Sequence, residues 1–226
     1  MGIKIQLICP TRGHQGLREK MIQTFAESNP KHSRILFVMD SDQAEATEFS
    51  SDLFDVQVIP ATQQRGIVSP MNLAHLNPNA ETYALIGDDV EFRDKGWEEK
   101  ILDARVTSLV VFGDENKTLT GKGNHPFWSS KITKILGYKA PRNLWHLFVD
   151  DFYQELGRRL NSLEYVNANI FHNHPALGHR DWEEVTQTVN SHEFFEHDRK
   201  AYREYLAMEM NAAVAKIRLL KLEWGD

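Results

Sequence analysis

The stretch Tyr83-Ala84-Leu85-Ile86-Gly87-Asp88-Asp89-Val90 joins an apolar run to two adjacent carboxylates. Short apolar runs that end at a turn are typical of buried strands in a parallel sheet. Open α/β folds bind their ligands at the carboxyl edge of such a sheet. Two neighbouring aspartates repel each other there, and a hard divalent cation such as Mg²⁺ or Mn²⁺ would remove that cost. The stretch therefore predicts either a metal site or a polar turn that caps the next helix.

The composition is that of one globular domain. The chain has 226 residues, of which 41% are hydrophobic and 26% are charged, and its formal net charge is -6. The negative charge argues against a broad phosphate-binding surface but permits a local basic groove. Cys9 is the only cysteine, which excludes an internal disulfide and a cysteine metal cluster. Because we find neither a membrane-spanning run nor a signal-peptide pattern, we expect a soluble, cytoplasmic protein.

Apolar patterning in the first half of the chain alternates between strand and helix periods. Strands are expected over residues 3–8, 35–39, 56–59, 83–86, 109–112 and 166–170, and Pro10 is expected to stop the first of them. Helices are expected around 17–25, from Ser69-Pro70, after Asp94 and around 150–160. Residues 113–123 are polar and contain several glycines, as is typical of a loop. The alternation predicts an α/β fold with a mainly parallel central sheet and helices on both faces.

Polar residues follow four of the predicted strands. They are Thr11-Arg12, the segment 40–42, Asp88-Asp89 and the segment 172–174. Since parallel strands end at the same edge of a sheet, these four clusters are expected to meet at one rim. His172 or His174 would then complete a metal shell with the carboxylates, because imidazole binds Mn²⁺ as well. The alternative for each histidine is a surface position in the loop before Pro175.

Three further sets of residues each allow a functional interpretation and an ordinary structural one. Arg65 precedes a helix start, where a guanidinium favours phosphate, or it is an exposed loop residue. Asp150 and Asp151 adjoin aromatic residues, so one of them is a general base with a raised pKa, or both cap a helix. His125 and Trp128 would contact a sugar acceptor, or they pack in the core.

The order of these motifs over residues 3 to 175 resembles the GT-A fold glycosyltransferases, most closely those of family 2 type. The resemblance implies a Rossmann-like GT-A fold in which Asp89 binds Mn²⁺ or Mg²⁺ and Asp88 faces the ribose or the metal. Gly87 departs from the pattern, because many members have an acidic residue there. The resemblance also implies the remaining roles: Thr11, Arg12, Asp40 and Asp42 at the nucleoside, Arg65 at the base or diphosphate, Asp151 or Asp150 as the catalytic base, and His172 or His174 at the metal.

The implied activity is metal-dependent transfer of a sugar from a nucleotide-sugar donor to a soluble hydroxyl acceptor, with inversion at the anomeric carbon. The acceptor is a saccharide, a protein or a modified nucleic-acid base. Two alternatives are a nucleotidyltransferase on a similar sheet and a sugar-nucleotide-binding module without turnover. The catalytic domain is expected to span residues 1–190. Residues 191–226 are expected to form a helical extension whose apolar stripe packs on that domain or forms a homodimer (Tyr202, Leu206, Met210, Val214, Ile217 and Leu220).

Overall fold

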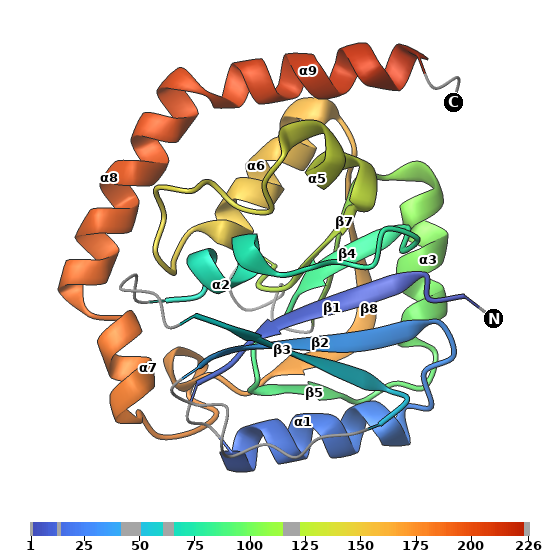
Figure 1. The fold of residues 1–226 in the computed structure, drawn as a ribbon, viewed down its shortest axis with the longest axis vertical. Coiled ribbons are helices and arrows are strands. Elements are labelled where there is room, and N and C mark those ends of the chain that lie inside the picture. Colours follow the sequence, from blue (N-terminus) through green and yellow to red (C-terminus); the bar gives the residue numbers. More distant parts are fainter. Residues whose placement is uncertain (1, 13–14, 42–50, 61–65, 115–122, 224–226) are drawn as a thin grey trace.

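The computed structural model describes residues 2–12, 15–41, 51–60, 66–114 and 123–223. Within these residues, eight strands form one sheet in the order β3-β2-β1-β4-β7-β6-β8-β5 (Figure 1). The strands are β1 (Ile5–Pro10), β2 (Ser33–Asp40), β3 (Phe54–Ile59), β4 (Thr82–Leu85), β5 (Val90–Phe92), β6 (Val110–Asp114), β7 (Pro126–Ser129) and β8 (Leu163–His172).

The sheet is mixed, with a parallel half that begins the chain. The pairs β1–β2, β2–β3, β1–β4 and β6–β8 are parallel, whereas β4–β7, β6–β7 and β5–β8 are antiparallel. The predicted α/β fold with a mainly parallel sheet is therefore confirmed. The antiparallel strands β5 and β7, and the helix after β7, are absent from the sequence prediction.

Helices cover both faces of the sheet (Figure 1). They are α1 (Gln15–Glu27), α2 (Val68–Leu73), α3 (Trp97–Thr107), α5 (Ser130–Leu136), α6 (Val149–Leu160), the short η2 (Pro175–Leu177), α7 (Glu184–Val189), α8 (His192–Met208) and α9 (Met210–Glu223). Alternate residues of a strand face opposite sides. Leu7 and Cys9 of β1 accordingly pack with Met21 and Phe25 of α1, whereas Ile8 belongs to the core on the other face.

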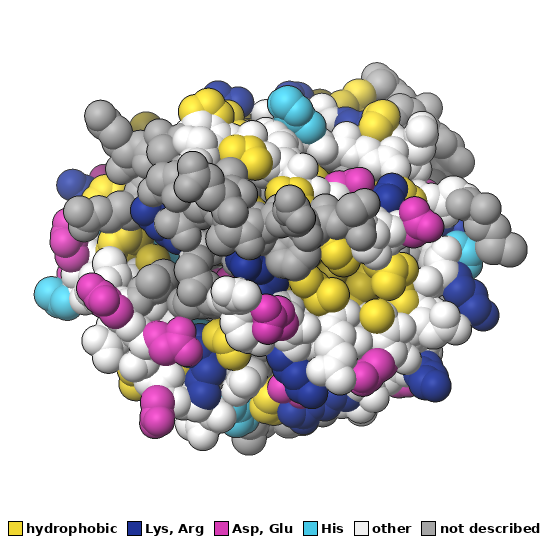
Figure 2. Space-filling model, turned by 60° about the horizontal axis from the view of Figure 1, so that its bottom comes forward, with side chains coloured by type: hydrophobic (Ala, Val, Ile, Leu, Met, Phe, Trp, Pro, Cys, Tyr) yellow, Lys and Arg dark blue, Asp and Glu magenta, His cyan; other side chains and the backbone are white. Residues whose placement is uncertain are grey.

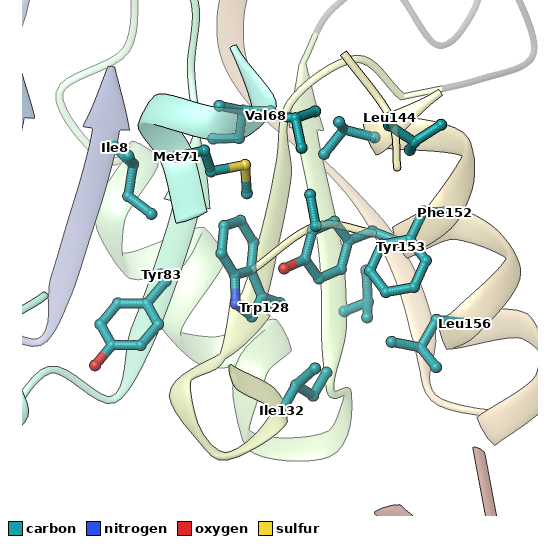
Figure 3. Close-up of a cluster of buried hydrophobic side chains, with 14 of the residues drawn as sticks. Ile8, Val68, Met71, Tyr83, Trp128, Ile132, Leu144, Phe152, Tyr153 and Leu156 are labelled. Atoms are coloured by element: carbon teal, nitrogen blue, oxygen red, sulfur yellow. The ribbon is translucent and has the colours of Figure 1, made fainter. Parts of the chain in front are cut away.

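The core on that second face is rich in aromatic side chains. Figure 3 shows Trp128 of β7 between Tyr83, Met71 and Tyr153. The rings of Trp128 and Tyr153 stack with centroids 4.3 Å apart, and Nε1 of Trp128 donates a hydrogen bond of 2.9 Å to Oγ1 of Thr133. This packing fixes β7 and α6 against each other, and α6 begins beside the cavity described below.

The helices α8 and α9 run along the outside of the α5 and α6 side of the molecule (Figure 1). Their apolar stripe faces inward, with Tyr205, Met210 and Ile217 almost fully buried against the core. The hydroxyls of Tyr205 and Tyr138 lie 2.5 Å apart and join α8 to the segment after α5. Among the described residues, no helix combines the length and the apolar character needed to cross a membrane.

Several element boundaries differ from the sequence prediction. The first strand starts at Ile5, later than expected, and it ends at Pro10. Pro10 can end the strand because a proline lacks only its own amide donor, which costs one hydrogen bond of the ladder. The helix α2 starts at Val68, before the predicted Ser69-Pro70 start, and Ser69 does not cap it. The strand β6 continues through Gly113 to Asp114, and residues 115–122 of the expected loop lie outside the described residues.

Candidate functional site

A cavity of about 510 Å³ opens at the carboxyl ends of β1, β2 and β4. Thr11 and Arg12 follow β1, Asp40 ends β2, and Asp88 and Asp89 follow β4, and all five line the cavity. The opposite wall comes from the end of β8, from residues 146–150 and from residues 174–190. Parallel strands thus bring the four polar clusters of the sequence to one place, within the residues that the structure describes. Asp42 and Arg65 lie outside the described residues.

Asp88 is held by a buried hydrogen-bonded chain. The hydroxyl of Thr11 donates a hydrogen bond of 2.6 Å to Oδ2 of Asp88 and accepts one of 3.5 Å from the guanidinium of Arg18. All three side chains are buried. Arg18 on α1 therefore compensates part of the charge of Asp88, and it is a residue that the sequence reading does not single out.

Arg12 and Asp40 form an ion pair at the mouth of the cavity. Nη1 of Arg12 lies 3.6 Å from Oδ2 of Asp40, and the Arg12 side chain is 53% exposed. The Asp40 side chain is only 14% exposed, so the pair lies partly in solvent and contributes little to stability. Both residues line the cavity, and their contact with a nucleoside stays a prediction.

Asp89, His172 and His174 form the one group of described residues whose geometry suits a bound metal ion. Their ligand atoms all lie within 4.8 Å of one another. The pairing of β5 with β8 explains this proximity, because Val90 faces His172 across the ladder. Oδ1 of Asp89 lies 3.3 Å from Nε2 of His172, and the amide of Asn173 donates to the carbonyl of Asp89 at 2.9 Å.

The protonation states of this group suit a cation. Burial by itself would raise the pKa of Asp89, but the hydrogen bond and charge of His172 outweigh it and hold that pKa well below its usual range. Burial lowers the pKa of His174 to about 4, so its ring is neutral at pH 7. Nδ1 of His172 is buried and has no hydrogen-bond partner among the described residues. A buried carboxylate beside imidazole nitrogens is a donor set that binds divalent metals.

Each imidazole already makes a hydrogen bond that it must give up before it binds a cation. Nδ1 of His174 accepts a hydrogen bond of 3.2 Å from the amide of Ala176, which places the proton of the neutral ring on Nε2. His174 must therefore give up this hydrogen bond or its Nε2 proton before it binds a cation. Nε2 of His172 donates a hydrogen bond to the carboxylate of Asp89, so His172 must likewise give up that proton before this nitrogen binds a cation.

Gly87 makes room for the carboxylate of Asp89. A Cβ atom at this position would lie 2.4 Å from Oδ1 of Asp89. The departure from the acidic residue of the resembling family thus has a steric reason in this chain. Asp89 folds back over the glycine toward His172.

The two residues predicted to contact an acceptor lie in different environments. His125 lines the cavity at its buried end, and its ring centroid is 4.6 Å from that of His172. Burial lowers the pKa of His125 to about 3, and its Nε2 has no hydrogen-bond partner among the described residues. Trp128 is fully buried in the aromatic core and is not brought to the cavity (Figure 3).

The acidic pair at the start of α6 is divided between the cavity and the helix. Asp150 lines the cavity, whereas Asp151 does not. The carbonyl of Asp151 accepts a hydrogen bond of 2.9 Å from the hydroxyl of Tyr202 on α8. Phe148, directly before the helix, also lines the cavity and has a φ of 65°, which is rare for a bulky residue.

Arg180 is a cavity residue that the sequence reading misses. Its guanidinium lies 3.6 Å from Oδ2 of Asp89, and its side chain is only 11% exposed. The carbonyl of Asn173 and the hydroxyl of Thr186 accept hydrogen bonds from it at 2.8 and 3.3 Å. A single arginine beyond the last strand has no pattern around it, so only the fold reveals that it faces the carboxylates.

The face of the molecule in Figure 2 carries basic and acidic side chains that are interspersed over its described part. This distribution agrees with the small negative net charge of -6.

Solved structures of three proteins share this fold. TarS 1–349 of S. aureus aligns with a TM-score of 0.58 at 13% identity over 92% of this chain and 73% of that chain, and it is also known in complex with UDP. The mannosyltransferase PcManGT of Pyrobaculum calidifontis, in complex with GDP-Man and Mn²⁺, aligns with a TM-score of 0.54 at 13% identity over 97% and 80% of the two chains. No family model matches this sequence, and neither does any curated protein.

The third protein is glucosyl-3-phosphoglycerate synthase of Mycobacterium tuberculosis, in complex with Mn²⁺, UDP and phosphoglyceric acid. It aligns with a TM-score of 0.53 at 9% identity over 88% of this chain and 78% of that chain. At these identities the likeness concerns the fold. It confirms the GT-A type of α/β fold that the sequence motifs predict.

Proposed function

We propose that this chain is a glycosyltransferase that moves a sugar from a nucleoside diphosphate donor to a hydroxyl acceptor. The observation that carries the proposal is the group of Asp89, His172 and His174 in the cavity at the strand ends. The fold is shared with a mannosyltransferase that holds GDP-Man and Mn²⁺, and this likeness supports the choice of donor.

Asp89, His172 and His174 would hold the metal, once the two imidazoles release their present hydrogen bonds. A donor set with imidazole nitrogen suits Mn²⁺ better than Mg²⁺, which prefers oxygen ligands and water. When bound, the cation supplies Lewis-acid stabilisation to the departing diphosphate.

The nucleotide occupies the side of the cavity formed by β1 and β2. Thr11 fixes the carboxylate of Asp88 for the ribose, and Arg12 with Asp40 borders the base. Arg180 places a buried guanidinium beside Asp89, so it is positioned to bind the oxygens of the diphosphate. Asp42 and Arg65 are part of this proposal on their sequence positions alone.

Asp150 acts as the general base, because it lines the cavity and Asp151 does not. It takes the proton of the acceptor hydroxyl while the hydroxyl oxygen forms a bond to the anomeric carbon. The bond from that carbon to the diphosphate breaks on the opposite side, and the diphosphate leaves with the electron pair. The product therefore has inverted stereochemistry. The acceptor class includes saccharides, proteins and modified nucleic-acid bases.

A thermal-shift screen tests the proposal. We expect UDP, GDP and their sugar conjugates to raise Tm only with Mn²⁺, since a ligand at about 100 times its Kd adds about 2.7 kcal/mol to the stability. Asp89→Ala should abolish the Mn²⁺-dependent part of the shift. Asp103→Ala, at an exposed position on α3, is the matched control and should keep it. An unchanged shift in Asp89→Ala would refute the metal site.

The released product separates this function from its alternatives. A glycosyltransferase releases UDP or GDP from the sugar nucleotide, whereas a nucleotidyltransferase releases pyrophosphate from a nucleoside triphosphate. Binding without any turnover would indicate a binding module. Asp150→Asn should abolish turnover while it leaves the Mn²⁺-dependent binding intact, and retention of configuration in the product would remove Asp150 from the role of base.

A further inference from the structure

The segment that leads into α6 has a strained backbone at the wall of the cavity. Phe148 has a φ of 65°, in the left-handed region that bulky residues avoid. Such conformations persist only where the surroundings determine them. His146, Leu147, Phe148 and Asp150 all line the cavity, so the path of this segment decides where the carboxylate of Asp150 points.

A carboxylate from α8 holds this segment. Asp198 is fully buried, and its two oxygens accept hydrogen bonds from the amides of three successive residues. The bonds from Trp145, His146 and Leu147 measure 2.8, 2.8 and 2.7 Å. Successive amides that converge on an anion form a backbone nest, and charge-assisted bonds of this kind are strong.

The neighbouring residue on α8 reinforces the same contact. Nδ1 of His197 lies 2.8 Å from Oδ1 of Asp198, and its ring stacks on Trp145 with centroids 3.5 Å apart. Two consecutive residues of α8, His197 and Asp198, therefore contact the start of the segment.

The segment also contacts the start of α2 and the residues before it. The carbonyl of Trp145 accepts a hydrogen bond of 3.0 Å from the amide of Val68 at the start of α2. Gly66 has a φ of 99°, and a Cβ atom there would lie 2.3 Å from the same carbonyl. Only glycine therefore fits against Trp145 at this point.

We propose that Asp198 is a positioning residue for the reaction. By binding the amides of residues 145–147, it keeps Phe148 in its left-handed conformation and thereby aims Asp150 into the cavity. This inference rests on the proposed role of Asp150 as the base. It makes the helix α8 part of the active site, although Asp198 itself touches no reacting atom.

The test compares two variants with a control in the full-length chain. Asp198→Asn keeps the volume of the side chain but turns an NH₂ group toward backbone amides. Gly66→Ala pushes the same segment from the other side and does not touch α8. Tyr205→Phe is the matched control, because it removes a buried hydrogen bond of α8 that does not involve residues 145–147.

Three quantities are measured: amide hydrogen exchange at residues 145–147, the Kd of UDP with Mn²⁺, and the rate of UDP or GDP release from saturating UDP-glucose or GDP-mannose. We expect Asp198→Asn and Gly66→Ala to speed the exchange and to lower kcat by about 10- to 100-fold, since small misplacements of a catalytic group cost this much. In Asp198→Asn the Kd should stay within about twofold, because the nucleotide contacts lie on other elements. Tyr205→Phe should lower Tm and leave kcat unchanged.

Each other result has a defined meaning. Unchanged kcat in both variants despite faster exchange would overturn the inference, and so would an equal loss of kcat in Tyr205→Phe. If Asp198→Asn fails to fold, Gly66→Ala decides alone. A wild-type chain that turns over neither sugar nucleotide, with exchange at residues 145–147 still dependent on Asp198, would refute the proposed function and leave Asp198 as a purely structural anchor.

Discussion

At the scale of single residues, the candidate metal site depends on Gly87 having no side chain. The carboxylate of Asp89 occupies the space that a Cβ atom at residue 87 would take, only 2.4 Å away. The position of that carboxylate in turn sets its contacts with His172 and Arg180. Gly87 therefore affects the site by leaving this space open for the carboxylate of Asp89.

We therefore expect Gly87→Ala to displace the carboxylate of Asp89 and to weaken Mn²⁺ binding. Groups that orient a metal ligand typically contribute about 10- to 100-fold to affinity, and we expect a loss of that size. Calorimetric titration with Mn²⁺ in the presence of UDP measures it. Gly96→Ala is the control, since its Cβ would meet its nearest neighbour at an ordinary 3.7 Å. Equal affinities in both variants would contradict the steric argument.

The residues of the site differ in how far the sequence reveals them. Asp88, Asp89, His172 and His174 lie at or shortly after the ends of β4 and β8, so their position at one rim follows from the parallel direction of these strands. Arg180 and Asp198 lie in a bend and on a helix without any distinguishing pattern. Only tertiary contacts place Arg180 in the cavity wall and Asp198 against residues 145–147. The sequence does not choose between Asp150 and Asp151, because the choice depends on how Phe148 starts the helix.

At the scale of elements, α6 links the cavity to the carboxyl-terminal helices. Glu155 on α6 binds Arg158 at 2.7 Å and Arg159 at 2.6 Å. Arg159 in turn donates a hydrogen bond of 2.6 Å to Asn211 on α9. Glu155 therefore orients the arginine that joins the two helices.

This contact predicts a pH-dependent effect of Glu155→Gln. The hydrogen bond from Arg158, followed by that from Arg159, lowers the pKa of Glu155 to about 2 in the folded chain. A lowered pKa stabilises the fold above the unfolded value, and this contribution disappears as the pH falls from about 4.5 toward about 2. Because the arginines are partly exposed to solvent, the variant should cost about 0.5–1 kcal/mol at pH 7.

Urea unfolding of the wild type and the variant between pH 7 and pH 3 measures this difference, with Glu204→Gln on the exposed face of α8 as the control. The destabilisation should shrink on acidification. A difference that stays constant over this range would contradict the assignment.

The sequence prediction misses the two short antiparallel strands β5 and β7. Residues 90–92 and 126–129 form β5 and β7, each three or four residues long, which is too short to show a period. Both pair with strands that are distant in sequence, so their existence depends on the assembled sheet. Pro126 also reads as a breaker, although a proline is tolerated as the first residue of a strand.

At the scale of the whole molecule, α8 and α9 cover the core, and α8 also contacts the segment that forms part of the cavity wall. Their inward stripe covers α5 and α6, and Asp198 reaches residues 145–147. The apolar stripe is therefore buried against the core of the same chain. The division of the chain into residues 1–190 and a separate extension stays a prediction, as does the homodimer.

We expect a chain that ends at residue 191 to lose cooperative unfolding and to bind a hydrophobic dye, because its core face is uncovered. The full chain should be a monomer by light scattering, since its apolar stripe is already buried. A shortened chain that remains folded, beside a full chain that is dimeric, would show that the helices serve association instead.

Anomalous diffraction at the manganese edge, from crystals grown with Mn²⁺ and UDP, tests the central claim most directly. We predict a manganese peak between the carboxylate of Asp89 and the imidazole of His172, with the diphosphate of UDP on its open side toward Arg180. A peak elsewhere, or a nucleotide bound away from these carboxylates, would contradict the proposed glycosyltransferase site.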